Sequence, residues 1–208
     1  MAGLREKQKA ARERRIIDAA ERLFRLHGYN QTKIEDVARE AGVAVGTVYN
    51  YFENKSNLLL TLVTEHDKVV SRGINELMKN PPNDLVEGVC GVFFTMTSHS
   101  LTRLGRENWR HLVGASIIQR HSVLGARFAA LNQFLLERIL GMLEALKENG
   151  LLSRDCNSKQ LGRILFRIEG MLYIDLVSGD AMTYEDYKSQ LTEDVRFVLQ
   201  PHLGSGSA

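Results

Sequence analysis

The chain has 208 residues, of which 44% are hydrophobic and 25% charged, with three prolines and a formal net charge of +2. This composition excludes disordered and collagen-like proteins, and the length suits one large domain or a small module joined to a larger one. No apolar run approaches the roughly 20 residues that span a membrane, and Cys90 and Cys156 lie in unrelated contexts. We therefore expect a cytoplasmic protein with free thiols.

The basic residues are concentrated at the front of the chain. Residues 1–60 contain eleven Lys and Arg against eight Asp and Glu, whereas residues 61–208 contain 16 against 17. Most of the excess lies in the first fifteen residues, where six basic side chains face only Glu6 and Glu13. This segment could contact phosphates, or it could be the solvated start of a helix, and charge alone does not separate the two.

Hydrophobic periodicity predicts about nine helices and no strand. The expected helices cover about residues 10–27, 33–41, 45–52, 55–78, 85–104, a short stretch around Trp109, 124–148, 158–178 and 184–199. The run over 85–104 is apolar on nearly every side, which is typical of a helix surrounded by neighbours. The strongest break is Asn-Pro-Pro-Asn at residues 80–83, because consecutive prolines cannot continue a helix.

Several residues mark where the first helices begin and end. Gly28 suits the left-handed position after a helix, and Gly42 can stop the second helix in the same way. Thr32 and Glu35 have the spacing of a capping box, which predicts a helix start near residue 33. Asn54 can cap the helix that follows residue 52.

Residues 34–52, with the sequence IEDVAREAGVAVGTVYNYF, have the pattern of a helix-turn-helix. Ala38 is small where a second helix would cross, Gly42 supplies the positive φ of a short turn, and Val48 can pack between the helices. Any corner of two helices could show this spacing by chance. However, the outward face of the second helix carries hydroxyl, amide and aromatic groups where a solvated helix would carry Lys and Glu.

Residues 16–59 resemble the N-terminal domain of the TetR family of transcriptional regulators, whose members end this motif in a run similar to GTVYNYFENKSNL here. The resemblance covers about the first quarter of the chain. It implies an all-α protein with an N-terminal three-helix helix-turn-helix DNA-binding domain and a C-terminal helical ligand-binding and dimerisation domain. We place the first domain at residues 1–56, the second at 57–203 and a flexible Gly/Ser tail at 204–208, whose origin the sequence leaves open.

The resemblance also implies which residues contact DNA. Those expected in the major groove are Val45, Gly46, Thr47, Asn50 and Tyr51. Those expected at phosphates are Thr32, Tyr49 and Lys55. Thr47 and Asn50 are also chemically suited to hydrogen-bond base edges. Val45 departs from the family pattern, which often has a long polar residue there, so sequence readout should depend more on Thr47, Tyr51 and DNA shape.

One helix-turn-helix contacts too few bases to select a genomic site, so we expect a homodimer on palindromic double-stranded operator DNA. The family usually dimerises through its last two helices, here residues 158–200. Gly162, Gly170 and Leu172 would permit close approach of a second copy. The apolar stripes of these helices could equally be internal core.

A small-molecule effector should bind the C-terminal domain and release the DNA, with the helix over 55–78 as the lever. The candidate pocket residues are Phe93, Phe94, Met96, His99, Trp109, His111 and Phe128. Core packing explains such an aromatic stripe as well. Nearby arginines would suit an anionic or acyl-type effector, although surface solvation also explains them.

Two other classes remain open, a helical enzyme and a helical interaction module that does not bind DNA. The chain lacks the motifs of a nucleophile elbow, a P-loop, a dinucleotide-binding turn and a zinc protease. Glu107 and His111 share a helical face but are too few for a metal site. We therefore expect no catalytic residue, cofactor or metal ligand. The sequence does not define the operator, the effector, the target genes or the sign of the response.

Overall fold

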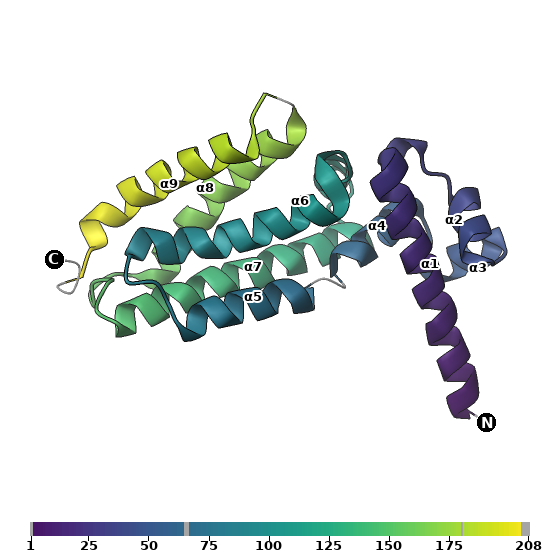
Figure 1. The fold of residues 1–208 in the computed structure, drawn as a ribbon, viewed down its shortest axis with the longest axis horizontal. Coiled ribbons are helices and arrows are strands. Elements are labelled where there is room, and N and C mark those ends of the chain that lie inside the picture. Colours follow the sequence, from purple (N-terminus) through teal and green to yellow (C-terminus); the bar gives the residue numbers. More distant parts are fainter. Residues whose placement is uncertain (1, 65–66, 180, 205–208) are drawn as a thin grey trace. The chain divides into compact units, whose positions relative to one another are not determined.

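The computed structural model describes residues 2–64, 67–179 and 181–204. In these ranges the chain forms nine α-helices and no strand, and one isolated bridge joins Leu152 to Leu203. The helices are α1 (Ala2–Gln31), α2 (Ile34–Ala41), α3 (Val45–Phe52), α4 (Lys55–Thr64), α5 (Asp67–Lys79), α6 (Leu85–Ile118), α7 (Val123–Glu148), α8 (Ser158–Ser178) and α9 (Tyr184–Leu199) (Figure 1). The predicted all-α architecture is confirmed. None of the described helices is long and apolar enough to cross a membrane.

The helices form two compact units, and each unit combines two stretches that are separated in the sequence. The first combines residues 1–66 with 102–128, and the second combines 67–101 with 129–208. The helix α6 therefore contributes residues to both units. The functional boundary that we place after residue 56 stays a prediction, as does the lever, whose residues 65 and 66 lie outside the described ranges. Residues 205–208 of the predicted tail also lie outside them.

Glycines interrupt two of the longest helices. Gly28 in α1 has φ 74° and ψ 171°, and Gly105 in α6 has φ 71° and ψ 167°. Glycine adopts these positive φ values without the steric cost that a side chain would add. The kink at Gly105 separates the two helices predicted over 85–104 and around Trp109. The break at Gly28 lies where the sequence predicts the first helix to end.

The predicted capping box at Thr32 is wrong. No side chain caps α2, whose N-cap residue is Lys33. The Thr32 side chain is buried, and its hydroxyl donates to the carbonyl oxygens of Leu23 at 3.1 Å and Gly28 at 2.8 Å. Because α1 is interrupted at Gly28, carbonyl groups near its end need donors other than helical amides, and Thr32 supplies one.

The predicted cap of α4 is confirmed. The backbone amide of Asn57 donates to Oδ1 of Asn54 at 2.8 Å, which satisfies one of the free amides at the start of the helix. The helix therefore begins immediately after the end of α3.

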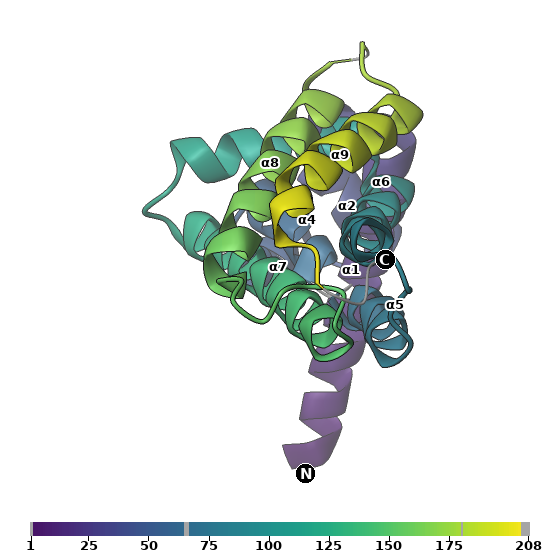
Figure 2. The same cartoon turned by 90° about the vertical axis from the view of Figure 1, so that its left-hand side faces the viewer.

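The second unit has an apolar core to which α5–α9 all contribute. Val89, Val92 and Phe93 of α6 are fully buried, as expected for a helix that is apolar on nearly every side. The helices α8 and α9 pack side by side (Figures 1 and 2). Thus α5–α9 form a helical bundle around a shared apolar core.

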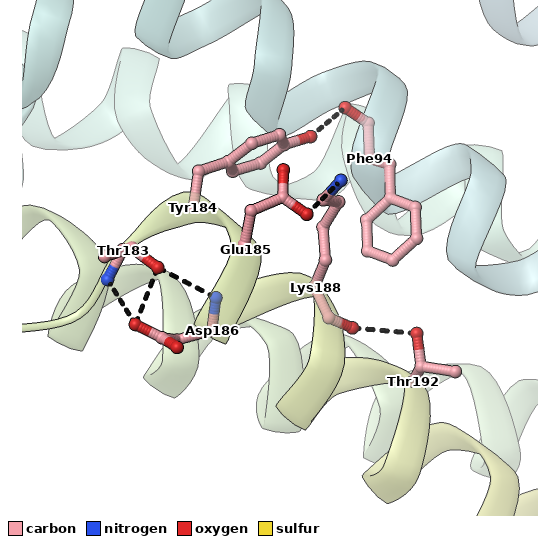
Figure 3. Close-up of polar contacts among 7 residues, drawn as sticks. All are labelled: Phe94, Thr183, Tyr184, Glu185, Asp186, Lys188 and Thr192. Atoms are coloured by element: carbon pink, nitrogen blue, oxygen red, sulfur yellow. Dashed lines mark hydrogen bonds and ion pairs between the residues drawn. The ribbon is translucent and has the colours of Figure 1, made fainter.

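The start of α9 is fixed by a capping box that the sequence analysis missed (Figure 3). The Thr183 hydroxyl accepts from the Asp186 amide at 3.1 Å, and the Asp186 carboxylate accepts from the Thr183 amide at 2.9 Å. The Thr183 hydroxyl also donates to the Asp186 carboxylate at 2.6 Å, and this bond, together with the one from the Thr183 amide, lowers the pKa of Asp186. The hydroxyl of Tyr184 donates to the Phe94 carbonyl at 3.3 Å, which joins α9 to α6. The T-x-x-D spacing at 183–186 is the signal that could have revealed this cap.

Candidate nucleic-acid interface

The helices α2 and α3 meet at the short turn that the sequence pattern predicts. Gly42 ends α2 in the left-handed conformation, with φ 65° and ψ 43°. The amide of Val43 donates to the Ala38 carbonyl at 3.0 Å, which closes the turn. Ala38 and Val48 are both buried, as predicted for side chains between the two helices. Together these features make a helix-turn-helix.

The outer surface of α3 carries the residues predicted to enter the major groove. Val48 and Phe52 are buried, so the helix turns its other faces outward. Gly46 and Asn50 are exposed, and nothing lies within 4 Å of the place where a Gly46 side chain would begin. The half-buried members of the predicted set are Val45, Thr47 and Tyr51. The helix has no charged residue, so it presents no carboxylate that would repel phosphates.

The two tyrosines of α3 have different surroundings. Tyr49 is 45% exposed, which leaves its side chain accessible for the predicted phosphate contact. Tyr51 donates its hydroxyl to the Lys9 carbonyl of α1 at 3.3 Å, and its ring stacks on Phe52 with 6.0 Å between centroids. The structure therefore brings Tyr51 against α1, a contact that sequence reasoning missed.

Lys55, a predicted phosphate contact, is held by backbone groups. Its Nζ donates to the carbonyls of Tyr29 at 2.7 Å and Thr32 at 3.1 Å, and it lies 4.1 Å from the centre of the Tyr29 ring. Burial lowers the pKa of Lys55. His111 stacks on the Tyr29 ring with 4.7 Å between centroids. A phosphate contact by Lys55 or by the buried Thr32 hydroxyl would require these bonds to be exchanged, so both contacts stay predictions.

Residues 102–118 of α6 hold the end of α1. The side-chain amide of Asn108 donates to the Phe24 carbonyl at 3.0 Å. Arg103 and Glu21 form an ion pair at 2.6 Å, with both side chains about three-quarters buried. No local sequence signal identifies these pairs, because their members lie more than 80 residues apart. They connect the last turns of α1 to a segment that is distant in the sequence.

Residues 16–62 match the family model described as bacterial regulatory proteins, tetR family. Residues 16–62 therefore form an N-terminal domain of the TetR family. Over 59 residues it is 44% identical to the fatty acid metabolism regulator protein of Bacillus subtilis, covering 28% of this chain and 30% of that relative. Over 71 residues it is 42% identical to the HTH-type transcriptional repressor KstR of Rhodococcus jostii, covering 34% of each. These matches thus span about a third of the relatives' own length.

Solved structures of TetR-family proteins share the fold over most of the chain. FadR of Thermus thermophilus, a repressor solved with lauroyl-CoA, has a TM-score of 0.66 and 22% identity, covering 90% of this chain and 93% of its own. FadR of Bacillus subtilis, solved with stearoyl-CoA, has a TM-score of 0.65 and 21% identity, covering 92% and 97%. The SmeT–triclosan complex, from Stenotrophomonas maltophilia, has a TM-score of 0.68 and 21% identity, covering 95% and 94%.

The effector candidates divide between the two units. Those in the second unit are Phe93, Phe94, Met96 and His99, and those in the first are Trp109, His111 and Phe128. Phe93 and Met96 are buried in the core of the second unit, and Phe94 packs edge-on against Tyr187 with 6.5 Å between centroids. The structure therefore does not place all seven in one unit, and effector contact by any of them stays a prediction.

The helices through which TetR-family proteins dimerise carry exposed apolar side chains here. On α8, Ile164 is 39% and Met171 60% exposed, and on α9 Phe197 is 78% exposed. Nothing lies within 4 Å of a side chain built at Gly170, which leaves that position open. The suggested role of Gly162 in a dimer is wrong, because its open side faces Leu140 and Leu143 of α7 within the same unit.

A polar cluster lies inside the core of the second unit. Oε1 of Glu169 accepts from the Tyr187 hydroxyl at 2.9 Å and from the Thr97 hydroxyl at 3.4 Å. Burial raises the pKa of Glu169 to about 7, against the effect of these two hydrogen bonds, which lower it. Nearby, the hydroxyls of Ser100 and Tyr173 share a hydrogen bond of 3.1 Å. Thus α6, α8 and α9 are joined by hydrogen bonds as well as by apolar packing.

Proposed function

We propose that this TetR-family regulator is a repressor that binds palindromic operator DNA as a homodimer and is released by a small-molecule effector. The observation that carries the proposal is the outer surface of α3, which is accessible, uncharged and rich in hydrogen-bonding groups. Buried Val48 and Phe52 hold this surface outward on a helix-turn-helix. Thr47 and Asn50 supply the hydroxyl and amide that can discriminate base edges.

The homodimer would form through residues 158–200. Ile164 and Met171 lie seven residues apart on α8, so they share one face of that helix. Together with Phe197 they expose apolar side chains that a second copy would bury. An exposed apolar patch of this kind favours a protein interface over a solvated surface.

We propose a fatty-acyl thioester of coenzyme A as the effector. The FadR proteins of Thermus thermophilus and Bacillus subtilis, which share this fold, were solved with such a ligand, and one curated relative is named as a regulator of fatty acid metabolism. The ligand combines an apolar chain with anionic phosphates, which fits the acyl-type or anionic class expected from the sequence. Residues 102–128 carry five arginines and one glutamate, and the seven candidate residues remain the proposed contacts.

The alternative readings have less support. TetR-family regulators are generally not enzymes, and we infer that this chain has no catalytic activity. Within the described ranges, no three His, Cys, Asp or Glu side chains lie together as a group that could hold a metal ion. An interaction module without DNA binding would leave the accessible groups of α3 without a role. The cytoplasmic location stays a prediction.

The experiment that tests the proposal begins with selection of bound duplexes from a random DNA pool. We expect recovery of a palindrome with half-sites roughly one helical turn apart, or a multiple of it. Binding of that duplex is then measured with lauroyl-CoA or stearoyl-CoA, and with free coenzyme A and triclosan as comparisons. Release by the acyl-CoA alone supports the effector class. Release by triclosan alone would instead indicate an effector of another chemical class. If no DNA sequence is enriched, the proposal that the chain is a repressor is refuted.

A further inference from the structure

The helix α1 extends well beyond the part that packs on the helix-turn-helix. Residues 5–12 are exposed and burial is complete at Ile16, whereas the helix itself begins at Ala2. Residues 2–15 form about 21 Å of helix at 1.5 Å per residue. Figure 1 shows this part of α1 extending away from α2 and α3. We refer to residues 2–15 as the arm.

Three basic residues of the arm continue the face through which α1 packs on its domain. Arg5, Lys9 and Arg12 are spaced four and three residues apart, and the buried residues Ile16 and Ala20 follow at four-residue steps. Residues at these spacings lie along one side of a helix. The basic stripe formed by Arg5, Lys9 and Arg12 therefore continues the buried face of α1 towards its N-terminal end.

The basic stripe is not neutralised within the described part of the chain. Arg5, Lys9 and Arg12 are exposed and form no ion pair with a described carboxylate. By contrast, Arg14 on another face pairs with Asp18 at 2.9 Å. A helix that needed only solubility would mix both signs of charge along its surface. The stripe instead concentrates positive charge, as a phosphate-binding surface does.

The recognition helix directly contacts the arm. The hydroxyl of Tyr51, near the end of α3, donates to the Lys9 carbonyl at 3.3 Å. The middle of the stripe is therefore beside the helix proposed to enter the major groove. From Arg5 to Arg12 the stripe covers about 10 Å along the helix axis, which is close to the roughly 12 Å width of that groove.

We propose that the arm is a second DNA-contacting surface, in which Arg5, Lys9 and Arg12 bind phosphates of the duplex that flanks the bases read by α3. This inference rests on the proposed function. The stripe contacts the sugar-phosphate backbone and contributes affinity without base specificity. Its occupant is duplex DNA, because a row of unpaired cations beside a recognition helix complements the regular negative charge of the flanking backbone.

The test compares two triple variants of the full chain that remove the same charge. The first is Arg5→Gln, Lys9→Gln and Arg12→Gln. The control is Lys7→Gln, Arg14→Gln and Arg25→Gln, which changes exposed residues on the opposite side of α1. Glutamine is a helix former comparable to lysine and arginine, so α1 is retained in both, which circular dichroism checks.

Fluorescence anisotropy measures the affinity of each protein for the selected operator duplex over a series of salt concentrations. The plot of log K against log salt has a negative slope. We expect this slope to become shallower in the stripe variant by about 0.9 for each phosphate contact removed, up to about 2.7 per protomer. Its affinity should fall at least roughly tenfold at 0.15 M salt. The control should keep most of the wild-type slope. Shortening the duplex flanks should weaken wild-type binding and leave the stripe variant unaffected.

The possible results of these measurements separate a specific arm–DNA contact from a general effect of charge. Equal losses in both triple variants would show a general charge effect and overturn the arm surface. A stripe variant with wild-type slope and flank dependence would overturn it too, while the proposed repressor would stand. If the wild-type chain enriches no duplex, the proposed function and the arm surface both fail. A reduced slope confined to the stripe variant, with flank dependence lost, supports the proposal.

Discussion

Glu169 places an ionisable group inside the core of the second unit, where its side chain is 6% exposed. Its pKa is about 7, compared with 4.5 for an ordinary glutamate. Because the folded-state pKa is the higher one, the unfolded chain releases this proton first as the pH rises. The contribution of Glu169 to stability is therefore fully present below pH 4.5 and is lost as the pH rises through about 7.

The size of the effect follows from the difference between the two pKa values. At about 1.4 kcal/mol per pH unit, ionising Glu169 in the folded state costs about 3 kcal/mol. Replacing Glu169 with Gln removes the charge and keeps an oxygen that can accept from the Tyr187 hydroxyl. We expect Glu169→Gln to be more stable than the wild type by up to about 3 kcal/mol at pH 8, and to lose this advantage at pH 5.

Urea denaturation from pH 5 to pH 8.5, at one fixed protein concentration, measures this difference. The fixed concentration matters because association of the chains would add to the apparent stability. Glu193→Gln on α9 is the matched control, since Glu193 is exposed and the variant removes the same charge. Parallel stability curves for wild type and Glu169→Gln would refute the reasoning. A pH-dependent gain in the control variant would also refute it.

Three further substitutions test the first unit and the surface of the second. Asn50→Ala should lower operator affinity by about 1–3 kcal/mol and relax base preference at one position, which anisotropy on single-base operator variants measures. Gly28→Ala should lower the unfolding free energy by about 1–2 kcal/mol, because alanine is strained at positive φ and its side chain would meet the Glu107 carboxylate. Thermal melts measure this loss, and Gly3→Ala is the control because nothing lies within 4 Å of a side chain built at Gly3. Phe197→Asp should convert a dimer to monomers in light scattering, and an unchanged mass would exclude this face as the interface.

The helices and the helix-turn-helix could be predicted because their signals are local. The spacing of apolar residues defines α6–α9, and the Asn-Pro-Pro-Asn break at residues 80–83 separates α5 from α6. Gly28 and Gly42 mark turns through their own backbone freedom. The predicted first helix begins about eight residues later than α1 does, because residues 5–9 are exposed and provide no apolar periodicity. The helix continues there through its own backbone hydrogen bonds.

The contacts that position the site could not be predicted, because they join distant parts of the chain. The sequence predicts that Lys55 is available to contact a DNA phosphate. In the structure its ammonium group donates to two backbone carbonyls that lie 23 and 26 residues away in the chain. Gly162 has the small size expected at a dimer interface, but it accommodates Leu140 of α7 instead. Thr32 has the spacing of a cap, but carbonyls at the interrupted end of α1 take its hydroxyl. The chemistry of each side chain can be read from the sequence, whereas the group that it contacts depends on the tertiary fold.

The first unit is assembled from two separate stretches of chain, and this has a consequence for its biosynthesis. Residues 1–66 leave the ribosome long before residues 102–128, which contain Arg103, Asn108 and His111. Until that second stretch emerges, Glu21 has no ion-pair partner from α6 and the Tyr29 ring has no stacked imidazole. Domains generally fold as units during synthesis. The nascent chain therefore completes its DNA-binding unit only after more than half of the protein has been translated.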